Sequence, residues 1–341
     1  MNSNTAICTW FVADDASSGT YFPQVGNTSD APEAQEIYWR CAVCFFASSI
    51  VVNPEVRHLF FTNTFLPTID GANIATLFAS WDVEVITLPI TYRLPADAVK
   101  SWGNQFYIFD ILDYFVMHPP AARAIVLDSD CLWLKPVDEM VAAIDAHGAL
   151  TYELGDDEYC AGSVINGLSR EQMARFVHSQ GGPDLKSIPY CGGEIYAASQ
   201  AVTEQLAARV RTLWPQVVSQ DCFAPREEAH FLSILYQFEG IKVGTANRFI
   251  RRMWTTFQHN NLAESDLELT VWHLPAEKKT GFSDLFQQIV RQHGANRAEL
   301  AEHGGLNFNQ LACSVGWPKR RPAKLMRDLA LKIREKLGHI M

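Results

Sequence analysis

The stretch AIVLDSDCLWL, residues 124–134, decides the fold because it places two acids inside an apolar segment. Burying an unpaired carboxylate is costly, and two carboxylates side by side repel each other. If the strand continues through them, Asp128 and Asp130 project to one side and Ser129 to the other. Such a pair at the end of a strand suits a hard divalent cation, because the cation cancels the repulsion. The alternative is a surface turn in which the two acids cap the next element.

The first half of the chain alternates apolar strand-like and helix-like segments. Asp30, Pro32 and Glu33 predict a helix start, with Asp30 as the cap and a proline in the first turn. Strands separated by helices pair in parallel with helices on both faces, and ligands gather at the carboxyl ends of the strands. The sequence therefore predicts an α/β fold with the two acids at that edge. The expected strands are 6–14, 58–64, 83–89 and 124–130, and the expected helices are 30 into the forties, 71–81 and 101–115.

Composition excludes several classes of protein. The 341 residues are 48% hydrophobic, yet no apolar run reaches the roughly 18 residues that span a bilayer, and the N-terminus lacks the pattern of a signal peptide. Cys41 and Cys44 form the one CxxC, inside a helix-like segment, which predicts reduced core cysteines in a cytoplasmic protein rather than a zinc site. The net charge is −10; residues 318–341 contribute +6, so the chain before residue 318 carries −16. So acidic a body is not expected to bind nucleic acid over a broad face.

Four segments, in order, resemble the GT-A-fold nucleotide-sugar glycosyltransferases, and most closely their bacterial lipopolysaccharide galactosyltransferase-like (family 8-like) branch. The resemblance implies a Rossmann-like, mainly parallel α/β domain over residues 1–282, followed by a helical extension at 283–341. It also implies transfer of a hexose from a nucleotide-sugar, with UDP favoured by the Ala-Asp-Asp run of the first segment. The segments are FVADDASSGTY (11–21), VLDSDCLWLKPVDEM (126–140), PYCGGEIYAAS (189–199) and VWHLPAEKKTGF (271–282).

The resemblance implies a Mn²⁺ or Mg²⁺ ion between Asp128, Asp130 and His273. His273 ends the apolar run LTVWH, so it too is expected at a strand end, where a neutral imidazole is a suitable third ligand. Lys278 and Lys279 suit the growing charge of a leaving diphosphate. The glycine pair permits a close approach of the donor or forms a plain turn. The other residues expected in donor binding are Val12, Ala13, Asp14, Asp15, Lys100, Asn104, Asp110, Asp128, Ser129, Gly192 and Gly193.

Three acids are candidates for the catalytic carboxylate. Glu228 and Glu227 follow Pro225 at a predicted helix start, where acids are also favoured by the helix dipole alone. The family branch has a DQD-like segment there, and this chain departs from it with Glu-Glu-Ala-His; Glu228 is preferred over Glu227. Glu194 directly after the glycines resembles the base of inverting galactosyltransferases. Retention of the anomeric configuration is favoured by the branch, and inversion stays open.

The C-terminal segment 318–341 is basic and amphipathic. It carries eight Lys and Arg against Asp328 and Glu335, with apolar residues recurring every three or four positions. Such a helix can lie in an anionic membrane interface, which would place the protein peripherally on the inner face of a membrane and favour a glycan or lipid-linked acceptor. Packing on the domain or on a twin subunit is the alternative.

Two other functions fit part of the sequence. A metal-dependent nucleotide-sugar phosphohydrolase would use the paired aspartates without a sugar acceptor. A nucleotide- or glycan-binding module with a decayed active site is the other alternative, and the intact set of two acids and a histidine opposes it. Motifs for a phosphate loop, a zinc protease, a serine hydrolase and a dinucleotide-binding fold are absent from the sequence.

Overall fold

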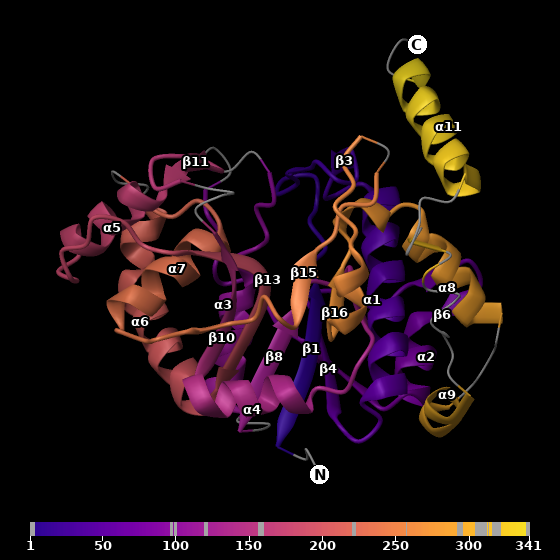
Figure 1. Cartoon of the computed structure of the whole chain (residues 1–341), viewed down its shortest axis with the longest axis horizontal. Helices are drawn as coiled ribbons and strands as arrows, with labels where there is room; N and C mark the ends of the chain where they lie inside the picture. The colour runs from indigo at the N-terminus through magenta and orange to yellow at the C-terminus, as the bar shows by residue number, and fades with distance from the viewer. Residues whose placement is uncertain are drawn as a thin grey trace.

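The computed structural model contains one central sheet of seven strands in the order β14-β10-β13-β8-β1-β4-β7 (Figure 1). The neighbouring strands from β8 to β7 are parallel, and so are β10 and β14, whereas β13 runs antiparallel to both of its neighbours. The strands are β14 (Gly244–Thr245), β10 (Ala149–Leu154), β13 (Tyr190–Ser199), β8 (Arg123–Leu127), β1 (Thr5–Phe11), β4 (Arg57–Thr62) and β7 (Val83–Thr87). The structure describes residues 4–95, 98, 101–118, 122–155, 160–219, 223–256, 258–291, 296–303, 312, 314–315 and 322–338.

Helices flank this sheet on both sides, which confirms the predicted α/β class with a mainly parallel sheet (Figure 1). On one side lie α1 (Pro32–Val52), α2 (Ile74–Ser80), α8 (Gly281–Arg291) and α9 (Arg297–His303). On the other lie α3 (Tyr107–Met117), α6 (Gln200–Val218) and α7 (Glu228–Phe238), with α5 (Arg170–Ser179) against α7. The helix α4 (Asp138–His147) begins beside the C-terminal end of α1, where the Val137 backbone N–H donates to Oδ1 of Asn53 at 2.8 Å. The last helix, α11 (Pro322–Gly338), extends away from the body. No described helix is both long enough and apolar enough to cross a bilayer.

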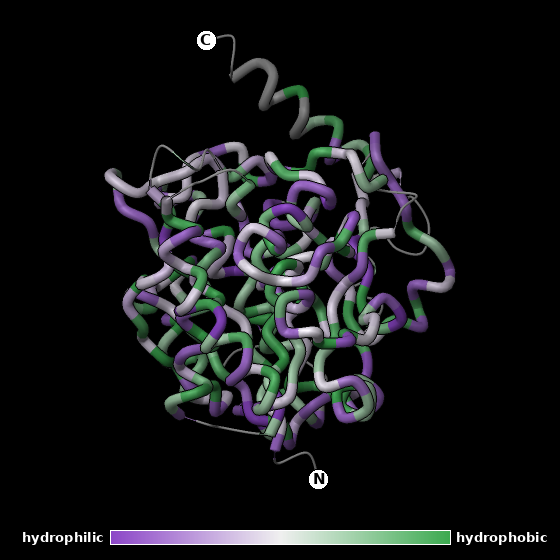
Figure 2. Tube along the Cα trace, turned by 90° about the vertical axis from the view of Figure 1, so that its left-hand side faces the viewer, coloured by the Kyte–Doolittle hydropathy of each residue, from purple (hydrophilic) through white to green (hydrophobic). Residues whose placement is uncertain are grey.

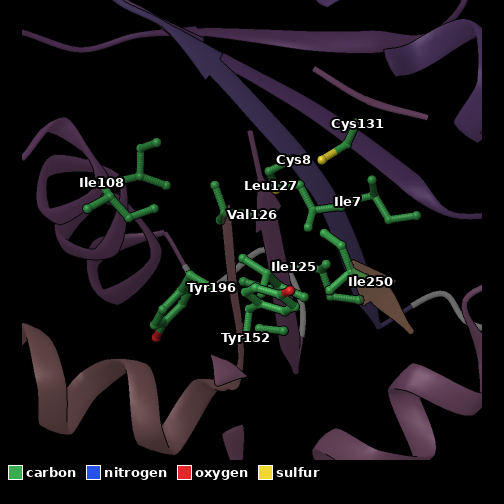
Figure 3. Packing of buried hydrophobic residues seen from close by; sticks show 14 of the residues in the cluster. Ile7, Cys8, Ile108, Ile125, Val126, Leu127, Cys131, Tyr152, Tyr196 and Ile250 are labelled. Carbon is green, nitrogen blue, oxygen red and sulfur yellow. The ribbon is translucent and has the colours of Figure 1, made fainter. Parts of the chain in front are cut away.

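The core lies where α1 and the central strands meet. From Cys41 to Ile50 every residue of α1 is buried, as expected of a helix that is apolar on all sides. Cys41 and Cys44 are among these buried residues, as predicted, and neither forms a disulfide. Figure 3 shows the apolar side chains of β1 and β8, including Ile7 and Ile125, packed together. Hydrophobic segments likewise run through the interior of the body (Figure 2).

A second, three-stranded sheet brings distant parts of the chain to the end of β8. Its order is β15 (Ile250–Arg252), β16 (Val271–His273) and β9 (Cys131–Trp133). His273 pairs with Cys131 across the antiparallel β16–β9 ladder, and the Leu274 backbone N–H donates to the Asp130 carbonyl at 3.0 Å. This ladder fixes the histidine beside the two acids.

Several predicted boundaries were wrong: for example, β1 ends at Phe11 rather than at residue 14, and α2 begins at Ile74 rather than at residue 71. The N-cap of α1 is Ala31, without a side-chain hydrogen bond, so Asp30 does not cap it. The helix expected from residue 101 begins at Tyr107, because Trp102 has a φ of 52° and the residues after it form turns. The strand expected to continue through residue 130 ends at Leu127, and Ser129 and Asp130 lie in a turn.

Three further pairs of short strands among the described residues lie outside these two sheets. β2 (Tyr21–Phe22) pairs with β3 (Asn27–Thr28), β5 (Thr68–Ile69) with β6 (Ala72–Asn73), and β11 (Val164–Ile165) with β12 (Leu168–Ser169). The boundary predicted between residues 282 and 283 falls inside α8, which contacts α1. The division of the chain into two parts stays a prediction.

Candidate active site

Asp128, Asp130 and His273 form a cluster in which one ligand atom of each lies within 4.8 Å of the others. Nε2 of His273 is 3.2 Å from Oδ2 of Asp130 and 3.6 Å from Oδ2 of Asp128. The Asp130 side chain is 1% exposed, whereas that of Asp128 is 38% exposed. Two carboxylate oxygens and one imidazole nitrogen fit Mn²⁺ or Mg²⁺, so the three residues can hold the ion that the sequence predicts.

Lys278 contributes a fixed positive charge beside this cluster. Its Nζ lies 2.8 Å from Oδ2 of Asp130, and it sits over the ring of Tyr38 at 5.3 Å from the centroid. Burial alone would raise the pKa of Asp130, but Lys278 and His273 outweigh it and hold that pKa well below its usual range. Asp130 is therefore ionised and tied in place, while Asp128 is the more accessible of the two acids.

A cavity of about 360 Å³ opens beside the cluster at the carboxyl end of β8. Aromatic side chains, including Trp10, Trp102 and Trp254, form part of its wall. This matches the edge where ligands gather in sheets of this kind. Most of the residues predicted from the sequence line it, namely Val12, Asn104, Asp128, Ser129, Asp130, Gly193, Glu194, Glu227, Glu228, His273 and Lys278.

The two glycines of β13 make room for carboxylates. A Cβ atom at Gly192 would overlap Oε2 of Glu194, and one at Gly193 would overlap Oε1 of Glu228. The sequence predicted a close approach at these positions, with the donor as the approaching group. In the structure the approaching groups are the two glutamates, and Gly193 alone of the pair lines the cavity.

The three candidate acids differ in how their oxygens are used. Glu227 accepts hydrogen bonds from the Tyr190 hydroxyl and, at 2.5 Å, from Nδ2 of Asn166. Oε2 of Glu228 is buried without a hydrogen-bond partner among the described residues. Burial, followed by the charge of Glu227, raises the pKa of Glu228 well above its usual value. Of this pair, Glu228 is the carboxyl group whose hydrogen-bonding capacity is still available to a substrate.

Glu194 is paired rather than available. It forms an ion pair with Arg252, and its Oε1 lies 3.8 Å from Nδ1 of His273. Arg252 lines the cavity but was missed from the sequence, because β15 is three residues long and its register with His273 comes from a non-local pairing. Tyr190 and Asn166 were missed for the same reason, as nothing local in the sequence marks them as partners of Glu227.

The Ala-Asp-Asp run lines a neighbouring cavity of about 440 Å³. Asp14 accepts hydrogen bonds from Ser29 at 2.6 Å and from Arg93 at 2.5 Å. Nδ2 of Asn104 lies 3.3 Å from the carbonyl of Val12, which lines the first cavity, and 3.3 Å from Oδ2 of Asp14, which lines the second. Asn104 therefore connects the walls of the two cavities. The residues around this second cavity are Ala13, Asp14, Asp15, Ser18, Asn63, Thr64, Ile90 and Arg93.

Asp110, Gly192 and Lys279 line neither cavity. Asp110 accepts from the backbone N–H groups of Thr91 and Tyr92, at 3.0 and 3.4 Å, and so holds that loop on α3. Burial raises the pKa of Asp110 to about 6. Lys279 is exposed, and Lys100 lies outside the described residues. For these positions a role in donor binding stays a prediction.

Comparison with known proteins gives a likeness in solved structures alone. No family model and no curated protein matches the chain. The bifunctional glycosyltransferase WbbM shares 8% identity over 80% of this chain, with a TM-score of 0.48, and the match spans 46% of WbbM. An active-site mutant of LgtC shares 11% identity over 79% of this chain and 86% of LgtC, with a TM-score of 0.46. Mouse xyloside xylosyltransferase 1 shares 12% identity over 78% of this chain and 96% of its own chain, with a TM-score of 0.42. Likeness this distant transfers neither activity nor substrate.

Proposed function

We propose that the protein is a metal-dependent glycosyltransferase of the GT-A type, which moves a sugar from a nucleotide-sugar to a hydroxyl acceptor. The observation that carries the proposal is the Asp128, Asp130 and His273 cluster, with Lys278 beside it, at the edge of the cavity. Two acids, an imidazole and a buried ammonium beside an aromatic-walled pocket suit a metal-bound diphosphate that carries a sugar. A UDP-sugar is the proposed donor, on the resemblance of the Ala-Asp-Asp run.

Each part of the site then has a role. Asp128, Asp130 and His273 would hold Mn²⁺ or Mg²⁺, which supplies charge stabilisation for the departing diphosphate. Lys278 adds a second positive charge for that group. Glu228 faces the cavity with an unengaged carboxyl, which suits proton transfer or stabilisation at the sugar or the acceptor hydroxyl. We propose retention of configuration, on the family resemblance, and NMR of the first-formed anomer distinguishes it from inversion.

A thermal-shift screen tests this function. UDP and UDP-sugars are expected to raise the melting temperature in the presence of Mn²⁺ but not in EDTA, whereas GDP and ADP are expected to have little effect. Ligand at 100 times its Kd stabilises the folded state by about 2.7 kcal/mol. Indifference to every nucleotide would reject the proposal. Release of phosphate from the nucleotide without any sugar acceptor would instead favour the phosphohydrolase, and metal-independent binding would favour a decayed module.

The proposed acceptor is a glycan or lipid-linked glycan at an anionic membrane surface. Met326, Leu329 and Ile333 lie one turn apart on α11 and are 67%, 43% and 50% exposed, and the surrounding segment is basic. Figures 1 and 2 show that the distal end of α11 stands clear of the body. An exposed apolar stripe with basic flanks suits the interface of acidic lipids. The cytoplasmic location stays a prediction.

Sedimentation with vesicles tests the membrane proposal. The chain is expected to co-sediment with vesicles that contain phosphatidylglycerol and to remain in solution with purely zwitterionic vesicles. Replacing Met326 and Ile333 by Ser is expected to reduce binding to the acidic vesicles strongly, because the two exposed apolar side chains no longer enter the interface. Equal binding by the wild type and this double variant would contradict the proposed surface.

A further inference from the structure

The C-terminal helix reaches into the body of the protein through Lys324. Nζ of Lys324 lies 2.8 Å from Oε1 of Glu277 and 2.9 Å from Oδ2 of Asp328, one turn along the same helix. The Lys324 side chain is 9% exposed and that of Glu277 is 1% exposed. A buried carboxylate needs an opposite charge or several hydrogen bonds, so this contact is more than a surface ion pair.

Glu277 belongs to the short segment that joins the candidate metal ligand to the candidate phosphate-binding lysine. The segment leaves His273, passes through a 3₁₀ turn at Pro275–Glu277 and arrives at Lys278. Its start is held by the hydrogen bond from Leu274 to the Asp130 carbonyl, and its end by the contact of Lys278 with the Asp130 carboxylate. Glu277 immediately precedes Lys278 in the chain, so a shift of the backbone at Glu277 also shifts Lys278.

Three groups fix the Glu277 carboxylate. The Thr255 hydroxyl donates to Oε1, the Thr280 hydroxyl donates to Oε2 at 3.0 Å, and Lys324 supplies the positive charge at Oε1. Thr255 and Thr280 are neutral, so among these three groups the charge on Glu277 is matched by Lys324 alone. Without Lys324, the turn at 275–277 would have to open towards water to solvate Glu277, and this would move Lys278 away from Asp130.

We propose that Lys324 is a positioning residue that holds Lys278 in place through Glu277, so that the C-terminal helix completes the donor site. This inference rests on the function proposed above, in which Lys278 binds the diphosphate. The same helix also has an outer anchor, the ion pair of Arg327 with Asp284 on α8, whose side chains are 37% and 45% exposed. Arg327 attaches the helix to α8, whereas Lys324 contacts the residue that precedes Lys278. Variants of these two residues therefore distinguish attachment of the helix from positioning of Lys278.

Calorimetric titration of UDP in Mn²⁺ tests the proposal on the full chain. Lys324→Met is expected to weaken UDP binding about tenfold, within the range found when residues that orient metal or phosphate ligands are removed. Lys324→Arg is expected to restore most of the affinity, because it returns a positive charge to Glu277. Arg327→Met is the matched control: it removes a helix-to-body ion pair at the outer anchor and is expected to change the affinity by less than about twofold.

Different failures are distinguishable. If the wild type binds no nucleotide in Mn²⁺, the proposed function is rejected and the positioning role with it. If the wild type binds UDP but Lys324→Met and Arg327→Met behave alike, or Lys324→Arg fails to rescue, the positioning role alone is rejected. Should Lys324→Met not fold, Glu277→Gln/Lys324→Met leaves no unpaired buried charge, so the turn has no cause to open and an affinity close to that of the wild type is expected. A tenfold loss of affinity in this double variant would overturn the proposal, because the loss would not pass through the charge on Glu277.

Discussion

Asp128→Asn is expected to lower the affinity for UDP and Mn²⁺ at least about 100-fold while leaving the protein folded, because Asp128 would bind the metal directly in the proposed site, and loss of residues that only orient such ligands already costs about 10–100-fold. Asp130→Asn is expected to lose the same binding and also about 3–5 kcal/mol of stability. The difference follows from burial: Asp130 is enclosed and neutralises Lys278, whereas Asp128 is partly exposed. Calorimetry in Mn²⁺ measures the binding, and chemical denaturation without metal measures the stability.

Two further variants make this comparison selective. Asp130→Asn/Lys278→Met removes both partners of the buried pair, so it is expected to recover stability relative to Asp130→Asn without recovering binding. Asp145→Asn removes an exposed acid that pairs with Arg123 and is not among the residues lining either cavity, so it is expected to leave binding unchanged. UDP binding by Asp128→Asn at the affinity of the wild type would remove Asp128 from the metal site.

The sequence predicted those parts of the site that depend on local pattern. An apolar run followed by Asp-Ser-Asp marks the end of β8, and alternation before His273 marks the end of β16, so both ends were predictable. The distance between them was not, because it depends on the pairing of β16 with β9, two three-residue strands about 140 positions apart. The family resemblance supplied that link, and the structure supplied its geometry.

Residues that act through a partner were the hardest to predict. Glu194 was one of three candidates for the catalytic acid; in the structure it pairs with Arg252 and its Oε1 lies 3.8 Å from Nδ1 of His273, and its catalytic role stays a prediction. Arg252 is brought there by the β15–β16 ladder, which leaves no local pattern. Lys324 is a comparable case. Its segment was expected to lie in an anionic membrane interface or to pack on the domain or on a twin subunit, and the structure shows Lys324 buried against Glu277.

Glu228→Gln is expected to lower kcat by about 10²–10⁴-fold while UDP binding is kept, because proton transfer by a positioned side chain contributes about that much. The same variant is expected to be more stable than the wild type at pH 7.5. In the wild type the carboxyl is buried, faces Glu227, Asp128 and Glu194, and has a raised pKa, so the folded state must keep a proton that the unfolded chain releases. A stability gain with a loss of activity is typical of a catalytic group in a strained setting.

The sign of the pH dependence provides the sharper measurement. The folded-state pKa of Glu228 lies above its ordinary value of 4.5, so between the two the folded chain binds more protons than the unfolded chain. Wild-type stability therefore falls as the pH rises from about 4.5. Glutamine does not titrate, so the melting temperature of Glu228→Gln, measured without metal, is expected to exceed that of the wild type by about 2 °C or more at pH 7.5, roughly 1 kcal/mol in a large domain. This difference should vanish near pH 4.5.

Glu227→Gln and Gly193→Ala show whether these effects belong to Glu228. Glu227→Gln perturbs a carboxylate already bonded to Tyr190 and Asn166, so it is expected to destabilise the protein, the opposite of Glu228→Gln.

Gly193→Ala places a methyl group where the Glu228 carboxylate lies, so it is expected to lower kcat with UDP binding retained. Gly162→Ala is its control, because no atom of the described residues, apart from the glycine and its chain neighbours, lies within 4 Å of the added methyl. If Glu228→Gln is fully active, or is less stable than the wild type at pH 7.5, the carboxyl is neither catalytic nor held protonated by its surroundings.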